Sequence, residues 1–208
     1  MHLHRERART PIVVLIAALI LSGPSTLFAQ KKTQGGEPGT TPQYILIIRH
    51  AEKPAEKDPS PDLSPAGIAR ARVLAGLFTA SATRPNPFPK PDYIFAASTT
   101  KRSRRPLATA APLGAALGLN VDTRFRNEAV AALASELLER RKYAGKTVLV
   151  VWHQGSIPEL ARALRAKDAP RSWKDSIFDR VWVITYDASG HATFQDRPQQ
   201  LVIGDSPT

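Results

Sequence analysis

Two histidines and a group of arginines are the residues of this chain that could do chemistry together. Arg49-His50 directly follows an apolar run at 44–48, and His153 directly follows a second apolar run at 147–152. Arginine offers a planar fork of donors that suits a phosphate, and its charge is permanent. A neutral imidazole nitrogen can attack phosphorus, so the pair at 49–50 could bind and attack one phosphate group. Taken alone, however, an Arg-His pair also fits a solvated surface.

The second histidine favours a shared site. His153 precedes Gln154-Gly155-Ser156 and then an expected helix, whose first backbone N–H groups can receive an anion. A third element, KRSRRPLATA at 101–110, follows another apolar run at 93–97. This basic cluster fits a solvated patch, a nucleic-acid contact, or one arginine that points into the same cleft. It lacks the interleaved aromatic residues that stack on bases, so we expect no nucleic-acid partner.

The elements that must position these side chains alternate between strand and helix. Such alternation predicts an α/β fold with a mostly parallel central sheet. Ligands of such sheets bind beyond the carboxyl ends of the strands, which is where both histidines and the basic cluster fall. Apolar β-rich runs, helix caps and turn residues predict strands at 44–48, 93–97, 119–121, 147–152, 181–186 and 192–195, and helices at 64–78, 104–117, 128–143 and 157–164.

Four motifs, in this order, are similar to those of a known family. They are RHAEK at 49–53, LSPAGIARA at 63–71, the segment 98–110 that ends in Thr109-Ala110, and VVWHQGSIPELARAL at 150–164. On these motifs the chain resembles the histidine phosphatase superfamily, the phosphoglycerate mutase-like proteins. The resemblance implies a three-layer α/β/α sandwich. It also implies a metal-independent phosphomonoesterase that needs no cofactor, because arginines and histidine supply the positive charge.

The resemblance also implies a role for each site residue. Arg49, Arg105 and His153 would hold the phosphate, while His50 would attack it and become phosphohistidine. Glu128, in the stretch FRNE at 125–128, would protonate the leaving oxygen. An acid that favours a helix N-terminus is an equally simple interpretation of Glu128.

Further positions stay open at the level of sequence. Two residues are inserted after Ser98 relative to the family pattern, so Arg102 or Arg104 could replace Arg105 as the second phosphate-binding arginine. Gln154 and Lys53 adjoin the two motifs as candidate substrate contacts, although a solvated side chain is the simpler interpretation of the lysine.

Alternative functions follow from the same residues. A phosphomutase and a non-catalytic domain that binds phosphate or phosphoprotein both keep the arginines. The substrate is expected to be a small phosphorylated molecule or a phosphoprotein. No His-Asp pair follows the second expected strand, which argues against the acid phosphatase and phytase branch.

The N-terminus predicts export. Three arginines precede the unbroken apolar run 12–21, and small and polar residues follow up to Ala29. This is the layout of a secretory signal, and the run is short for a membrane span. We therefore expect a signal peptide or N-terminal anchor at 1–29, a flexible leader at 30–43 and the phosphatase domain at 44–208. The protein would be periplasmic or secreted, and a membrane would be contacted only through an uncleaved N-terminus. The net charge of +11 favours anionic partners, and the absence of cysteine excludes disulfides.

Overall fold

The computed structural model describes residues 39–55, 58–82 and 84–206. The expected signal peptide and residues 30–38 of the expected leader lie outside them and stay predictions. The last residues of that leader are part of the fold, because the Thr41 carbonyl accepts a bond from Gly145 and Gln43 bonds both Lys146 and Tyr186. Backbone hydrogen bonds therefore join Thr41 and Gln43, which precede the boundary expected at residue 44, to the rest of the described domain. The expected boundary itself stays a prediction. Within the described ranges, no helix has the length and apolar character to cross a membrane.

A six-stranded sheet forms the centre of the domain, in the order β3-β2-β4-β1-β5-β6. The first four strands in this order are parallel, whereas β5 runs antiparallel to β1 and β6 antiparallel to β5. The mostly parallel sheet predicted from the sequence is confirmed. The strands are β1 (Tyr44–Arg49), β2 (Tyr93–Ala96), β3 (Val121–Asp122), β4 (Thr147–Trp152), β5 (Arg180–Tyr186) and β6 (Ala192–Pro198).

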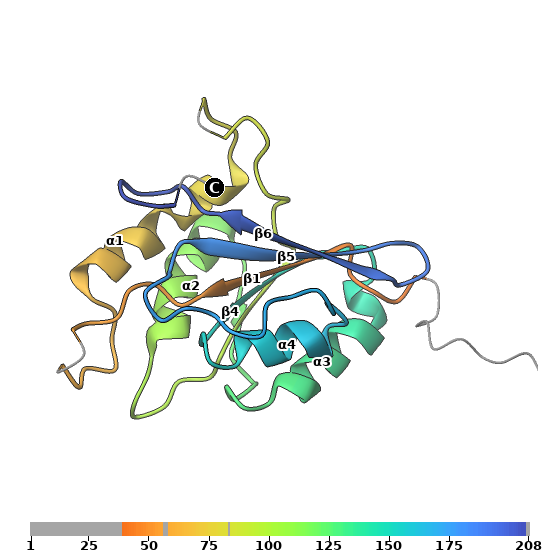
Figure 1. Cartoon of the computed structure of the whole chain (residues 1–208), viewed down its shortest axis with the longest axis horizontal. Helices are drawn as coiled ribbons and strands as arrows, with labels where there is room; N and C mark the ends of the chain where they lie inside the picture. Colours follow the sequence, from red (N-terminus) through yellow and green to blue (C-terminus); the bar gives the residue numbers. More distant parts are fainter. Residues whose placement is uncertain (1–38, 56–57, 83, 207–208) are drawn as a thin grey trace, which may run out of the picture. The chain divides into compact units, whose positions relative to one another are not determined.

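Helices cover both faces of this sheet, which gives the three layers that were expected (Figure 1). They are α1 (Pro65–Val73), the 3₁₀ helix η1 (Leu74–Phe78), α2 (Arg105–Leu117), α3 (Val130–Glu139), the 3₁₀ helix η2 (Arg141–Tyr143) and α4 (Ile157–Ala163).

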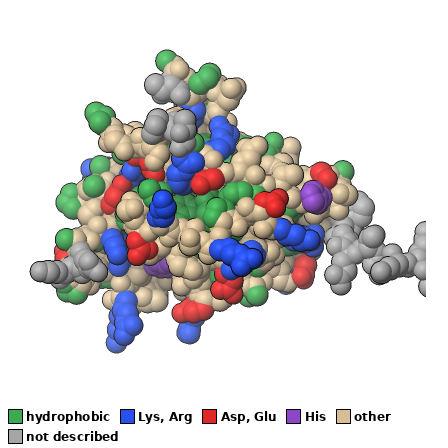
Figure 2. Space-filling view, in the orientation of Figure 1, with side chains coloured by type: hydrophobic (Ala, Val, Ile, Leu, Met, Phe, Trp, Pro, Cys, Tyr) green, Lys and Arg blue, Asp and Glu red, His purple; other side chains and the backbone are tan. Residues whose placement is uncertain are grey.

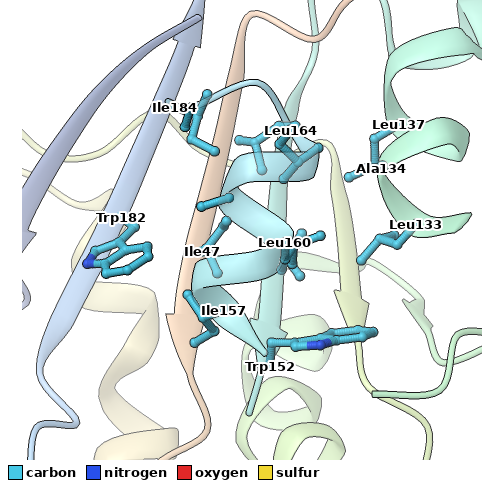
Figure 3. Packing of buried hydrophobic residues seen from close by; sticks show 14 of the residues in the cluster. Ile47, Leu133, Ala134, Leu137, Trp152, Ile157, Leu160, Leu164, Trp182 and Ile184 are labelled. Carbon is cyan, nitrogen blue, oxygen red and sulfur yellow. The ribbon is translucent and has the colours of Figure 1, made fainter. Parts of the chain in front are cut away.

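The alternation of side chains along β1 creates two separate cores. Ile45 and Ile47 pack with α3 and α4 on one face, whereas Leu46 and Ile48 pack with η1 and α2 on the other. Figure 3 shows the first core, in which α3 lies beside α4 and residues of both helices pack with residues of the sheet. Because both faces of the central strands are buried, their sequences are continuous apolar runs.

The helix predicted at 128–143 is shorter than expected at both ends. Before it, the Asn127 side chain bonds Ser156 and its carbonyl accepts the Trp152 indole N–H, which ties this residue to the end of β4. After it, Tyr143 is buried against Tyr93. If α3 continued, residue 143 would not lie on the buried face of the helix. The chain therefore leaves α3 before Tyr143, and the ring is buried at the end of η2.

Helix α1 starts as its sequence predicts. The Ser64 hydroxyl accepts a bond from the Gly67 N–H, and Pro65 occupies the first turn. Gly67 has a second reason to be glycine, since a Cβ there would lie 2.3 Å from the carbonyl oxygen of Glu52. The start of α1 is therefore packed directly on the loop that follows β1.

Candidate active site

The two predicted histidines lie side by side at the carboxyl ends of adjacent strands. Strands β1 and β4 are parallel neighbours, with Arg49 opposite Trp152. One residue further on, the His50 backbone N–H donates to the Trp152 carbonyl over 2.9 Å. The imidazole rings of His50 and His153 are 5.1 Å apart between centroids and meet edge to face at 73°. The sheet therefore brings together two side chains that are 103 positions apart in the sequence.

His50 is held as a neutral ring with one free nitrogen. Its Nδ1 lies 2.7 Å from the Ala51 carbonyl oxygen, which can only accept, so Nδ1 carries the proton. In the neutral ring, Nε2 then keeps its lone pair. Burial lowers the pKa of His50 to about 3, with further lowering by His153, Arg49 and Arg105 against the opposing effect of the Ala51 bond. At neutral pH the ring is uncharged and Nε2 can act as a nucleophile.

His153 is neutral for similar reasons. Burial lowers its pKa to about 4, and the charges of Arg105 and Arg49 lower it further, whereas Glu128 raises it. Both guanidinium groups lower the pKa of both rings, which indicates that the two arginines lie near the two histidines. A negatively charged ligand among these four side chains would stabilise the protonated form of each ring.

Arg49, the last residue of β1, is 1% exposed, and only some of its N–H donors are hydrogen-bonded. Its NH1 donates to the carbonyls of Asp175 (2.6 Å) and Ile177 (3.1 Å). Its Nε and NH2 are buried and have no hydrogen-bond partner. Burial lowers the pKa of Arg49 to about 10, which leaves the guanidinium charged at neutral pH.

Arg105 is the arginine of the basic cluster that belongs to this site. It is the first residue of α2, and its Nε and NH1 are buried without partners. Arg104 points elsewhere, because it is exposed and makes a two-bond ion pair with Asp62 at 2.7 and 2.9 Å. Arg102 is exposed as well. Of the three open positions, the geometry favours Arg105.

Thr109 explains how Arg105 is placed next to His50. The Thr109 hydroxyl accepts a bond from the Ala51 N–H over 2.9 Å and donates to the Arg105 carbonyl over 2.8 Å. One buried side chain therefore joins the first turn of α2 to the loop that follows His50. This bond gives a physical reason for the Thr-Ala pair that anchors the motif in the sequence.

Together these groups form a site for a multiply charged anion. The charge of Arg105 lowers the pKa of Arg49, and in the described part of the chain neither arginine forms an ion pair with a carboxylate. An unmade hydrogen bond on a buried donor costs about 1–3 kcal/mol. A tetrahedral oxyanion would accept bonds from both guanidinium forks and remove this cost.

The remaining predicted residues border the site. Glu128 is exposed, and its charge acts on His153. The Gln154 amide donates to a carboxylate oxygen of Asp175 over 3.2 Å. The structure therefore brings Arg49, His50, Arg105 and His153 together. Glu128 and Gln154 lie outside this group of four, and Lys53 is exposed on the loop after β1.

Three contributors were missed in the sequence. The Phe178 ring lies over the Arg49 guanidinium at 3.8 Å, and Asp175 and Ile177 supply the carbonyls that bind it. They belong to an irregular segment between α4 and β5 that has no recognisable motif. The only signal was their place just before an expected strand that pairs with β1.

The surface charge in Figure 2 is mixed, and the described residues hold no cluster suited to a metal ion. On the face drawn in Figure 2, Lys and Arg side chains lie among Asp and Glu side chains. Residues 39–206, apart from the few that are not described, contain no group of three or more His, Asp or Glu side chains that could hold a metal ion.

Comparisons with known proteins agree with the fold. No protein-family model and no curated protein matches the sequence. Among solved structures, the protein histidine phosphatase SixA complexed with tungstate matches with a TM-score of 0.52 and 18% identity, over 75% of this chain and 97% of that one. A phosphoserine phosphatase from Entamoeba histolytica in complex with 3-phosphoglyceric acid gives 0.51 and 14%, over 76% and 99%. The fold that the sequence resemblance implied is therefore confirmed.

Protonation of the two histidines should depend on bound anion. Without a ligand, both rings are expected to stay neutral at pH 5, since burial lowers both pKa values below that pH. The unfolded chain takes up these protons near pH 6.5, so the free energy of unfolding should fall as the pH drops below about 6.5. Saturating inorganic phosphate should raise both pKa values. Nitrogen NMR of the imidazoles measures this, and titration near pH 6.5 without a ligand would contradict the burial argument.

The affinity for an anion should distinguish Arg105 from the neighbouring Arg104. Arg105→Ala removes two buried unpaired donors and should weaken binding of inorganic phosphate strongly, by roughly 10- to 100-fold for a charge-assisted pair of bonds. Arg104→Ala is the matched control, because it removes the neighbouring charge but only a solvent-exposed ion pair. Isothermal titration calorimetry compares them. Equal losses in both variants would show a general charge effect in place of a specific site.

Proposed function

We propose that this chain, which has the histidine phosphatase fold, is a phosphomonoesterase that acts through a phosphohistidine on His50. One observation carries the proposal. Two buried guanidinium groups with unpaired N–H donors surround a neutral histidine whose Nε2 is free. The tungstate in the SixA structure supports an oxyanion in this fold, because tungstate and phosphate are both tetrahedral oxyanions.

Binding comes first. The Nε and NH2 donors of Arg49 would hold the phosphate oxygens as a fork, and the buried unpaired donors of Arg105 would supply further bonds. His153, at 5.1 Å from the His50 ring, would contact the same group. Negative charge from the phosphate raises the pKa of His153, so this ring can be protonated in the complex and donate a bond to an equatorial oxygen.

Phosphoryl transfer follows by in-line attack. His50 Nε2 forms a bond to phosphorus while the bond between phosphorus and the ester oxygen breaks. Nδ1 keeps its proton and its bond to the Ala51 carbonyl, which fixes the ring and stabilises the charge it gains. The arginines hold the charge on the equatorial oxygens throughout.

The leaving oxygen needs a proton, and Glu128 is the residue we assign to it. Its charge raises the pKa of His153, which supports a role for this carboxyl at the phosphate site, and its exposure allows it to exchange protons with solvent. In the second step the resulting carboxylate takes a proton from water, which attacks phosphorus and breaks the bond to Nε2. Free phosphate and the original His50 result.

A turnover assay tests this function. The purified protein should hydrolyse an aryl phosphate at the same rate with and without a chelator, and His50→Ala should lower kcat by at least about a thousandfold because no other group replaces the nucleophile. In the same assay Glu128→Gln should slow an alkyl phosphate more than an aryl phosphate, since only the poorer leaving group depends on the acid.

Two results would overturn the proposal. Hydrolysis that survives in His50→Ala would assign the activity to other residues. Tight binding of inorganic phosphate without hydrolysis of any ester would instead indicate a binding domain of the same fold. Thermal unfolding of each variant serves as the folding control.

A further inference from the structure

The segment from Trp173 to Phe178 encloses the Arg49 guanidinium on several sides. Two backbone carbonyls of this segment, those of Asp175 and Ile177, accept both bonds of NH1. The Phe178 ring stacks on the face of the same group, with the guanidinium carbon 3.8 Å from the ring centroid. The ring also lies 6.2 Å from the His50 ring, so it borders both residues of the motif.

We propose that Phe178 is a positioning residue for phosphate binding by Arg49. The inference rests on the proposed function in one respect, namely that the ligand of Arg49 is a phosphate. All five N–H donors of a guanidinium lie in its plane. Stacking on Phe178 fixes that plane, and the two carbonyls fix its rotation within the plane. The edge formed by Nε and NH2, which has no partner, is then the only fork left for a ligand.

Hydrogen bonds from Trp173 and Gln199 hold the segment in position, so that it can in turn position Arg49. The Trp173 indole N–H donates to the Ile177 carbonyl over 2.9 Å, the same oxygen that binds Arg49. The side-chain amide of buried Gln199 donates to the carbonyls of Phe178 and Arg180, at 3.2 and 3.3 Å. Gln199, which directly follows β6, therefore holds the segment from Trp173 to Phe178 next to the start of strand β5.

Fixing Arg49 in advance has a definite consequence for binding. A free arginine side chain has many rotamers, and ordering it on ligand binding costs about 0.5–1.5 kcal/mol. The contacts of Arg49 with Phe178 and with the two carbonyls already order its side chain when the chain folds, so ligand binding does not have to order it. Loss of the stacking on Arg49 should therefore weaken phosphate binding, even though Phe178 offers the ligand no hydrogen bond.

Phe178→Leu tests the inference, with Phe178→Tyr as the matched control. Leucine keeps an apolar side chain but loses the ring face, whereas tyrosine keeps that face. We expect Phe178→Leu to weaken binding of inorganic phosphate by roughly fivefold to twelvefold, which corresponds to the upper half of that ordering cost because arginine is rich in rotamers. Phe178→Tyr should bind within about twofold of the original protein, since its ring can still stack. KM for an aryl phosphate should rise in Phe178→Leu in parallel with the dissociation constant.

The same substitution in an Arg49→Lys background separates positioning from a general packing effect. Lysine has no planar group to hold, so Phe178→Leu should change phosphate binding there by less than about threefold. An equal loss in both backgrounds, or unchanged binding in Phe178→Leu, would overturn the inference.

The binding measurement also separates the two proposals. Phosphate binding that follows this pattern without any ester hydrolysis would leave the inference standing and contradict the proposed function. A protein that binds no phosphate would overturn both. Thermal unfolding shows whether each variant is folded.

Discussion

The structure of this site depends on two neighbouring arginines whose buried N–H donors are unpaired and which form no ion pair with a carboxylate among the described residues. Arg49 and Arg105 each keep two nitrogen donors that meet neither solvent nor an acceptor. Each of the two charges also lowers the pKa of both histidines. A protein gains nothing in stability from such an arrangement, because unpaired buried donors and like charges both oppose folding. It becomes favourable when a multiply charged anion binds, which connects the geometry directly to phosphate chemistry.

Arg70 shows how different a structural arginine looks in the same protein. It is as deeply buried, with 4% of its surface exposed, yet it is fully engaged. Asp205 takes two of its bonds, and Glu52 and Gln199 take others. These acidic partners raise the pKa of Arg70, whereas burial lowers that of Arg49 and Arg105. Arg70 also ties the loop after His50 to the C-terminal segment, so the fold uses it to support the site.

The sequence predicted the parts of the site that are local to strand ends. Arg49, His50 and His153 could be placed because each lies at or just after the end of a buried strand, and parallel strands end at one edge. Choosing among Arg102, Arg104 and Arg105 required the helix start, since only Arg105 begins α2 and is joined by Thr109 to the histidine loop. Phe178 could not be found, because it reaches Arg49 through the pairing of β5 with β1 and from a segment without regular periodicity.

The most direct measurement of the central claim is the identity of the phosphorylated residue during turnover. Reaction with an aryl phosphate, rapid quenching in alkali and peptide mass spectrometry should find one phosphoryl group on the peptide that contains His50. That group should be labile in acid, as a phosphorus–nitrogen bond on imidazole is. A phosphoryl group on any other residue, or rapid turnover with none on the chain, would contradict the account.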